Sequence, residues 1–227
     1  MHALLIAAAL TAAPAEAHSF ESVDAAAAAL VHEVQTGTLL FSKGDCLAIK
    51  VYTKSPYTHV AAVVVQDGTP WVYDSQNGAG VRRLDLDEYL RAQRPERLHV
   101  HHPREPFSPE QTECFVAHLD EQLGRPYDVL HHVTGKRADG LHCSEYVTDA
   151  LMACRIVRAN RPSRVSPASL REGIVGSSLY TAGRTLEIQM PVAEVPEGDS
   201  WCEQLWIDTG VCTTRCCAKM QRWFLCR

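Results

Sequence analysis

Between residues 143 and 154, apolar residues recur at the spacing of one helix face. The positions that share this face are Tyr146, Val147, Ala150, Leu151 and Cys154. Steps of three and four residues predict an amphipathic helix. Gly140 gives the backbone the freedom for an entry turn, so Cys143 is expected in the first turn of the helix.

The rest of the pattern predicts an α+β chain. Helices are expected over residues 22–34 and 108–124, strands over 38–42, 60–65, 71–73, 97–101 and 179–189, and one or two helical turns over 46–52. Asp67 and Gly68 separate two apolar runs and predict a hairpin. Ser108, Pro109 and Gln111 predict a capped helix start. Because strands dominate the first half and helix 143–154 follows them, the elements indicate an α+β fold.

Length and charge limit the classes of function that the chain can have. The chain has 227 residues and a formal net charge of −5, with a pI near 6.1. This length fits one globular domain with a small appendage. An acidic balance argues against a nucleic-acid-binding surface.

The N-terminus predicts export. Residues 3–13 form an apolar run, and Ala15-Glu16-Ala17 gives a small-x-small cleavage pattern, so residues 1–17 are expected to be a signal peptide. The run is shorter than the ~20 residues that span a bilayer, so no transmembrane segment is expected. The alternative is an alanine-rich N-terminal helix. Export would place the protein in the periplasm or outside the cell, where disulfides form.

The C-terminal extension, residues 198–227, is rich in cysteine. Five of the nine cysteines lie there: Cys202, Cys212, Cys216, Cys217 and Cys226. We expect at least two disulfides involving them, because so short a segment cannot build its own core. A zinc site is the alternative, but the extension has no C-x-x-C pair and no histidine. The sequence does not indicate an oligomeric state.

Cys143 is the candidate nucleophile. Unpaired N–H groups and the helix dipole at a helix start stabilise a thiolate. The alternative is a small buried hydrophobic residue, as most free cysteines are. His59 opens one strand of the predicted hairpin and Asp74 closes the other, so a cross-strand contact is feasible. The alternatives are a solvated strand-end histidine and an ordinary acidic residue.

His99 and His101 share one face of a predicted strand. An H-x-H pair can hold a metal ion, but no nearby cysteine or acidic pattern completes a ligand set. We therefore expect solvated surface histidines, and neither a metal nor a cofactor.

Several motifs resemble one known family. They are GTLLF from position 37, SPYTHV from 55, WVYD from 71 with Gly80-Val81, LGRPYD from 123, and LHCSEYV from 141. Over about residues 36–170 these resemble the circularly permuted branch of the NlpC-type papain-fold cysteine peptidases, the YiiX-like amidases. In that branch histidine precedes cysteine, as it does here.

The resemblance implies a fold and a site. The fold is a permuted papain-like domain, here residues 18–197, with an antiparallel sheet packed against the nucleophile's helix. Carried over by position, Cys143 is the nucleophile, His59 the base and Asp74 the third member, where the family usually has a glutamate. Tyr127 matches a tyrosine that lines the cleft.

The resemblance also implies a reaction. An exported cysteine hydrolase would cleave an amide bond of a peptide or acyl-amide substrate through a thioester, with cell-wall peptide, and hence peptidoglycan, as the expected source. Two alternatives stay open. One is an acyltransferase or thioesterase acting on lipid acyl groups, and the other is a non-catalytic binding module of the same fold.

Overall fold

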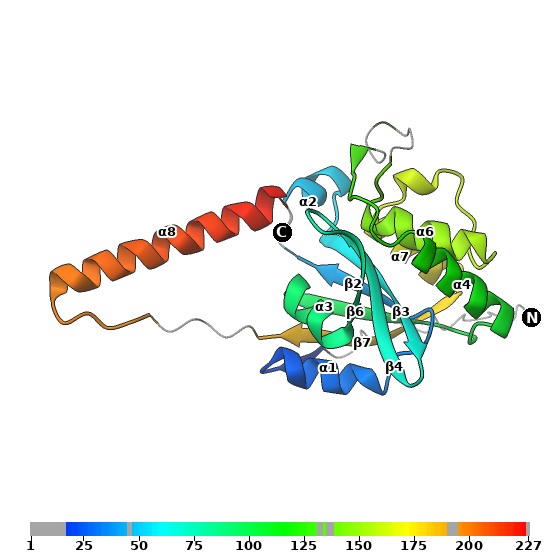
Figure 1. Cartoon of the computed structure of the whole chain (residues 1–227), viewed down its shortest axis with the longest axis horizontal. Helices are drawn as coiled ribbons and strands as arrows, with labels where there is room; N and C mark the ends of the chain where they lie inside the picture. Colours follow the sequence, from blue (N-terminus) through cyan, green and yellow to red (C-terminus); the bar gives the residue numbers. More distant parts are fainter. Residues whose placement is uncertain (1–16, 45–46, 131–133, 135–138, 190–194, 226–227) are drawn as a thin grey trace, which may run out of the picture.

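The computed structural model describes residues 17–44, 47–130, 134, 139–189 and 195–225 (Figure 1). Almost all of the predicted signal segment, together with Cys46 and Cys226, therefore lies outside the described residues. Within them, the helices are α1 (Val23–Val31), α2 (Leu47–Thr53), α3 (Leu86–Gln93), α4 (Pro109–Glu121), α6 (Cys143–Ala153), α7 (Pro167–Gly176) and α8 (Trp201–Leu225), with a short 3-10 turn at Pro162–Arg164.

Seven strands form one sheet in the order β1-β7-β6-β2-β3-β4-β5. Their bounds are β1 Ala17–Phe20, β2 Leu39–Lys43, β3 Tyr57–Gln66, β4 Thr69–Gln76, β5 Gly80–Asp85, β6 Arg97–Pro103 and β7 Tyr180–Ile188. Only β1 and β7 pair in parallel, whereas the other neighbours are antiparallel. The predicted α+β class and antiparallel sheet are confirmed.

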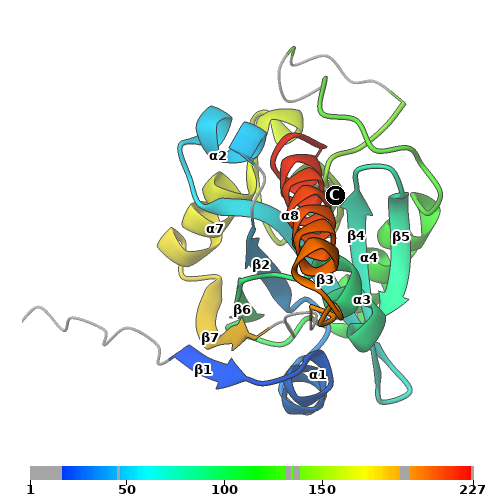
Figure 2. The ribbon, with the colours of Figure 1, turned by 90° about the vertical axis from the view of Figure 1, so that its left-hand side faces the viewer.

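Helices cover both faces of the sheet, which explains the unbroken apolar run in β3. Val60, Ala62 and Val64 pack with α4, α6 and α7 on one face. Ala61 and Val63 pack with α1 and α3 on the other face. Figures 1 and 2 show these two layers on opposite sides of the strands. Because side chains alternate along a strand, a sheet buried on both faces needs apolar residues at every position.

The predicted helix start at Ser108 is confirmed. Its side chain accepts the N–H of Gln111, and the Gln111 side chain accepts the N–H of Ser108 at 2.9 Å, which is a complete capping box. Several elements were not predicted from the sequence: the helices α7 and α8, the 3-10 turn, the strands β1 and β5, and the helix α3. Of these, β5 and α3 lie beside the candidate site.

The C-terminal extension is helical, which was not expected from the sequence. Residues 201–225 form one helix, α8, which begins away from the domain and runs back toward it, so that its C-terminal part lies beside α2 (Figure 1). Cys202, Cys212, Cys216 and Cys217 are exposed free thiols. A helix rises 1.5 Å per residue, so Cys202 and Cys212 lie roughly 15 Å apart along its axis. The predicted disulfides are therefore not confirmed among the described residues.

Candidate active site

Cys143 is the first residue of α6 and is only 2% exposed. His142 caps this helix: its Nδ1 accepts the Glu145 N–H at 3.3 Å, and its Nε2 lies 3.0 Å from the Ser163 carbonyl oxygen. These bonds hold the entry turn of α6 against the 3-10 turn. The N–H of Cys143, in the first turn, has no acceptor within its own helix. Sequence reasoning had not identified His142 as the cap.

His59 and Asp74 lie side by side on β3 and β4. His59 Nε2 is 3.1 Å from Asp74 Oδ2, and both side chains are buried. The register pairs Ala62 with Tyr73, which makes His59 and Asp74 diagonal neighbours on one face of the sheet. Since Nε2 is turned to Asp74, Nδ1 is the nitrogen left to face the Cys143 thiol, whose charge acts on the His59 ring.

The Asp74 carboxylate is fully satisfied by two residues that the sequence had not singled out. Arg82, its direct cross-strand partner on β5, donates from Nε to Oδ1 at 2.8 Å and from Nη2 to Oδ2 at 3.2 Å. Gln93, at the end of α3, donates to Oδ2 at 2.9 Å. The Tyr89 ring, also on α3, lies stacked beside the His59 ring at 6.3 Å.

The electrostatics favour a thiolate–imidazolium pair. Burial disfavours the Cys143 thiolate, but the charge of His59 and the neighbouring His142 and His59 side chains outweigh it and lower the pKa of Cys143 to about 6. Burial also disfavours the His59 imidazolium, but the Cys143 thiolate and Asp74 raise its pKa to about 9. Despite burial, His59 and Arg82 hold the pKa of Asp74 below its ordinary value. Such shifts are typical of catalytic pairs.

Tyr127 lies next to Cys143 through a short backbone pairing. The Leu141 N–H donates to the Pro126 carbonyl at 3.0 Å, and the Ser75 hydroxyl donates to the Leu141 carbonyl at 2.7 Å. Burial and the neighbouring Cys143 thiolate raise the pKa of the Tyr127 phenol, so it stays protonated. The structure thus brings Cys143, His59, Asp74 and Tyr127 into one site.

Alkylation should report the Cys143 thiolate directly. Because its pKa is lowered to about 6, its reaction with iodoacetamide should remain fast from neutral pH down to about pH 6 and be lost below it. An ordinary thiol loses reactivity below a pKa of ~8.5. Peptide mapping at pH 6.5 should find Cys143 modified before the exposed cysteines of α8. A Cys143 midpoint near pH 8.5 would contradict the assignment.

Gly80 allows the backbone at Arg125, two residues before Tyr127, to pack closely against β5. The N–H of Val81 donates to the Arg125 carbonyl at 2.8 Å, and a Cβ on Gly80, at φ +74°, would collide with that carbonyl oxygen. We expect Gly80→Ala to lower the free energy of unfolding by roughly 3 kcal/mol, combining left-handed strain with displacement of backbone. Urea denaturation measures this effect.

Gly68 provides the matched control. It has a similar φ of +78°, but open space surrounds its Cβ position. Gly68→Ala should therefore cost only the left-handed strain, roughly 1–2 kcal/mol. An equal decrease in the free energy of unfolding in the two variants would show that the contact with Arg125 does not contribute.

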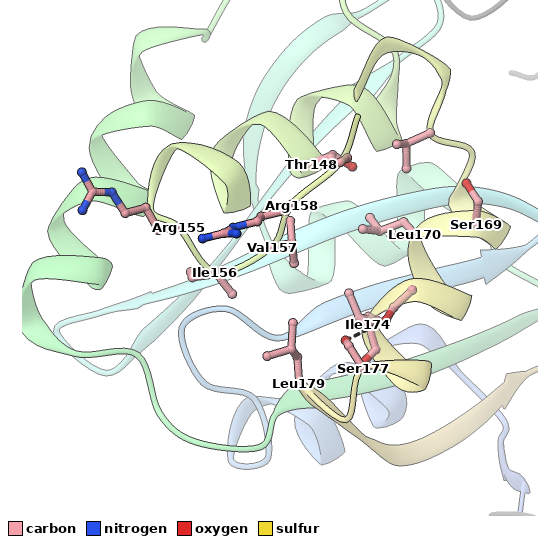
Figure 3. A pocket seen from close by; sticks show the side chains of 13 residues that line it. Thr148, Arg155, Ile156, Val157, Arg158, Ser169, Leu170, Ile174, Ser177 and Leu179 are labelled. Carbon is pink, nitrogen blue, oxygen red and sulfur yellow. Dashed lines mark hydrogen bonds between the residues drawn. The ribbon is translucent and has the colours of Figure 1, made fainter. Parts of the chain in front are cut away.

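A separate cavity of about 420 Å³ lies between α7 and the C-terminal end of α6 (Figure 3). Ile156, Val157 and Leu170 contribute to its apolar lining, and Arg155 and Arg158 also line it. Cys143 begins α6, so this cavity lies at the other end of the helix from the thiol.

The expectation of solvated histidines on β6 is wrong. His101 is 1% exposed and His99 is half-buried. The reason is that α7 packs over this part of the sheet, a long-range contact that the strand pattern alone does not reveal. Within the described ranges, no three His, Cys, Asp or Glu side chains converge as a set of metal ligands.

Histidine precedes cysteine in this chain, yet the two meet at the start of α6, as in a papain-like cysteine hydrolase whose sequence order has been permuted. Residues 33–186 match the model of the permuted papain-like amidase family YaeF/YiiX, C92. The chain belongs to this family and is a cysteine hydrolase of the peptidase/amidase type. The family and the permuted fold predicted from the motifs are confirmed.

A solved structure supports the fold. The chain resembles the crystal structure titled metalloprotein YiiX from Escherichia coli O157:H7, with a TM-score of 0.55 and 20% identity over 69% of this chain and 98% of that chain. At this identity the likeness concerns the fold alone. The comparison with curated proteins gives no match. Among the described helices, none is long and apolar enough to cross a membrane.

Proposed function

We propose that the protein is exported and hydrolyses amide bonds in cell-wall peptides, with Cys143 as nucleophile, His59 as base and Asp74 as the group that orients His59. The observation that carries this proposal is the buried contact of His59 with both Cys143 and Asp74, which favours a thiolate near neutral pH. A positioned base and an activated thiol are the requirements of covalent amide cleavage.

The proposed reaction has two stages. The Cys143 thiolate attacks the amide carbonyl carbon, and the C–N bond breaks as the His59 imidazolium gives its proton to the leaving amine. Neutral His59 then takes a proton from water, whose oxygen attacks the thioester and releases the carboxylic acid and the thiolate. The Cys143 N–H and the protonated Tyr127 hydroxyl are suitable donors for the oxyanion that forms in each stage.

Export is proposed from the sequence. The apolar run over residues 3–13 and the Ala15-Glu16-Ala17 pattern favour signal cleavage, and with it a periplasmic or extracellular location. Cell-wall peptide is a polymeric amide of that compartment, and we propose it as the substrate.

The test is incubation with defined peptidoglycan fragments and, separately, with acyl esters, followed by mass spectrometry. We expect new amine and carboxylate ends in the peptides with the native protein and none with Cys143→Ala. Acyl transfer from the esters without any peptide cleavage would instead establish the lipid acyltransferase or thioesterase function. Cleavage that persists in Cys143→Ala would exclude the thioester route.

A further inference from the structure

Helix α7 places an arginine over the sheet near the candidate site. The Arg171 guanidinium carbon lies 4.9 Å from the centre of the Tyr57 ring, and the Lys43 ammonium lies 5.4 Å from the same centre. Arg171 Nε also donates to His101 Nε2 at 3.0 Å. Lys43, Tyr57 and Arg171, here named the cationic cluster, are all partly exposed.

The cationic cluster lacks compensating negative charge. Within the described part of the chain, neither Lys43 nor Arg171 forms an ion pair with a carboxylate, whereas neighbouring Arg97 is paired with Glu187. Burial, with the positive charges of Lys43 and Arg171, lowers the pKa of His99 to about 4. His99 is therefore neutral at pH 7, and the positive charge beside Tyr57 comes from Lys43 and Arg171. Clustered cations without acidic partners create a potential that attracts anions.

The histidine beside the cluster has an unused polar atom. His99 Nδ1 contacts the Thr185 hydroxyl at 3.1 Å, while its Nε2 is buried and has no hydrogen-bond partner among the described residues. The His99 ring is packed edge-on against Tyr57 at 5.4 Å. A buried polar atom without a partner is uncommon and is consistent with a site that is completed by a ligand.

The cationic cluster lies at the same end and on the same face of the sheet as the nucleophile. The β2–β3 register pairs Ser42 with His59 and, across a register shift, Lys43 with Tyr57, so both pairs lie at the same end of the two strands. Because Ser42 and Lys43 are consecutive, Tyr57 and His59 turn to opposite faces of the sheet. Tyr57 packs against the core cluster that contains Cys143. A substrate held by the cationic cluster would therefore extend along this end of the sheet toward the thiol.

We propose that Lys43 and Arg171, stacked on Tyr57, form a subsite that binds a carboxylate of the amide substrate. This inference rests on the proposed function and narrows it to amides whose acyl part carries a second carboxylate. Arg171 can pair with a carboxylate through two parallel hydrogen bonds, because the guanidinium geometry matches that group. Tyr57 holds both cations in place through their contacts with its ring.

A binding experiment tests the subsite without turnover. Imidazole resonances of protein labelled with ¹⁵N-histidine are followed at pH 7 and constant ionic strength during titration with succinate, and with uncharged succinamide. We expect His99 to shift saturably with succinate alone. Its dissociation constant should rise roughly tenfold in Arg171→Gln and in Lys43→Gln, as expected for one lost charge-assisted hydrogen bond.

Two further variants sharpen this test. Arg171→Lys keeps the charge and should retain part of the affinity, whereas Arg158→Gln removes an exposed arginine that lines the separate cavity and should leave the affinity unchanged. The proposal is overturned if succinamide produces the same shifts, if succinate produces none, or if Arg158→Gln weakens binding as much as Arg171→Gln does.

Turnover then tests the substrate class. N-acyl dipeptide anilides that end in Glu or in Gln differ by one carboxylate, and we expect kcat/KM to favour the Glu substrate about tenfold in the native protein and not in Arg171→Gln. An unchanged preference in that variant would contradict the subsite. If neither anilide is cleaved, the proposed function is contradicted, while the succinate titration still decides whether the subsite exists.

Discussion

His59→Ala is expected to lower kcat/KM for amide hydrolysis by about 10³-fold, within the range that a positioned acid–base group contributes. The variant loses both the proton donor for the leaving amine and the positive charge that stabilises the thiolate. The pKa of Cys143 should therefore rise from about 6 toward the ordinary ~8.5. The pH profile of Cys143 alkylation and steady-state kinetics measure the two effects independently.

Two controls accompany this experiment. His32 is an exposed histidine, so His32→Ala should change neither the rate nor the alkylation profile. His59→Gln keeps most of the buried volume and separates loss of the base from loss of packing against Tyr89. If His59→Ala leaves the Cys143 profile unchanged, His59 is not the partner of the thiolate.

Asp74→Asn should reduce kcat/KM by roughly 10–100-fold, less than loss of the base, because an orienting group acts through the imidazole. Asp74 is 0% exposed and accepts hydrogen bonds from His59, Arg82 and Gln93. An amide in its place leaves the Arg82 guanidinium without its anionic partner and stabilises the imidazolium less. The pKa of His59 should fall below its present value of about 9, which NMR titration can measure.

The matched variant is Asp74→Glu, which restores the acid usual in the family. If charge at this position is what matters, Asp74→Glu should retain more activity than Asp74→Asn, although the longer side chain must compete for the space filled by Arg82. Activity of Asp74→Asn equal to that of the native protein would show that Arg82 and Gln93 alone suffice to position His59.

The proposed catalytic residues could be identified from local patterns, but the residues that support them could not. A helix start at Cys143 and a hairpin between His59 and Asp74 depend on turn and periodicity signals within about 15 residues. Arg82 and Gln93 reach Asp74 only because β5 pairs with β4 and α3 folds back onto the sheet. A signal for α3 was present: Asp85 caps it, and Leu86, Tyr89 and Leu90 form its buried face.

The burial of the β6 histidines could not be predicted from their own strand. Nothing local in β6 indicates that α7 covers His99 and His101, because that contact joins residues about 70 positions apart. The extension was expected to need disulfides because it is too short for a core. Residues 201–225 form one regular helix, whose backbone hydrogen bonds lie within the segment, and the disulfides stay a prediction.

The parallel pairing of β1 with β7 determines when the domain can be completed during synthesis. Thr185 pairs with Ala17, the last residue of the proposed signal segment. Until β7 has been made, β1 has no strand to pair with and β6 keeps an open edge. Such long-range closure is slow. The newly made chain can therefore complete its sheet only after β7 has been synthesised. The proposed N-terminal export signal is exposed from the start of translation, well before that point.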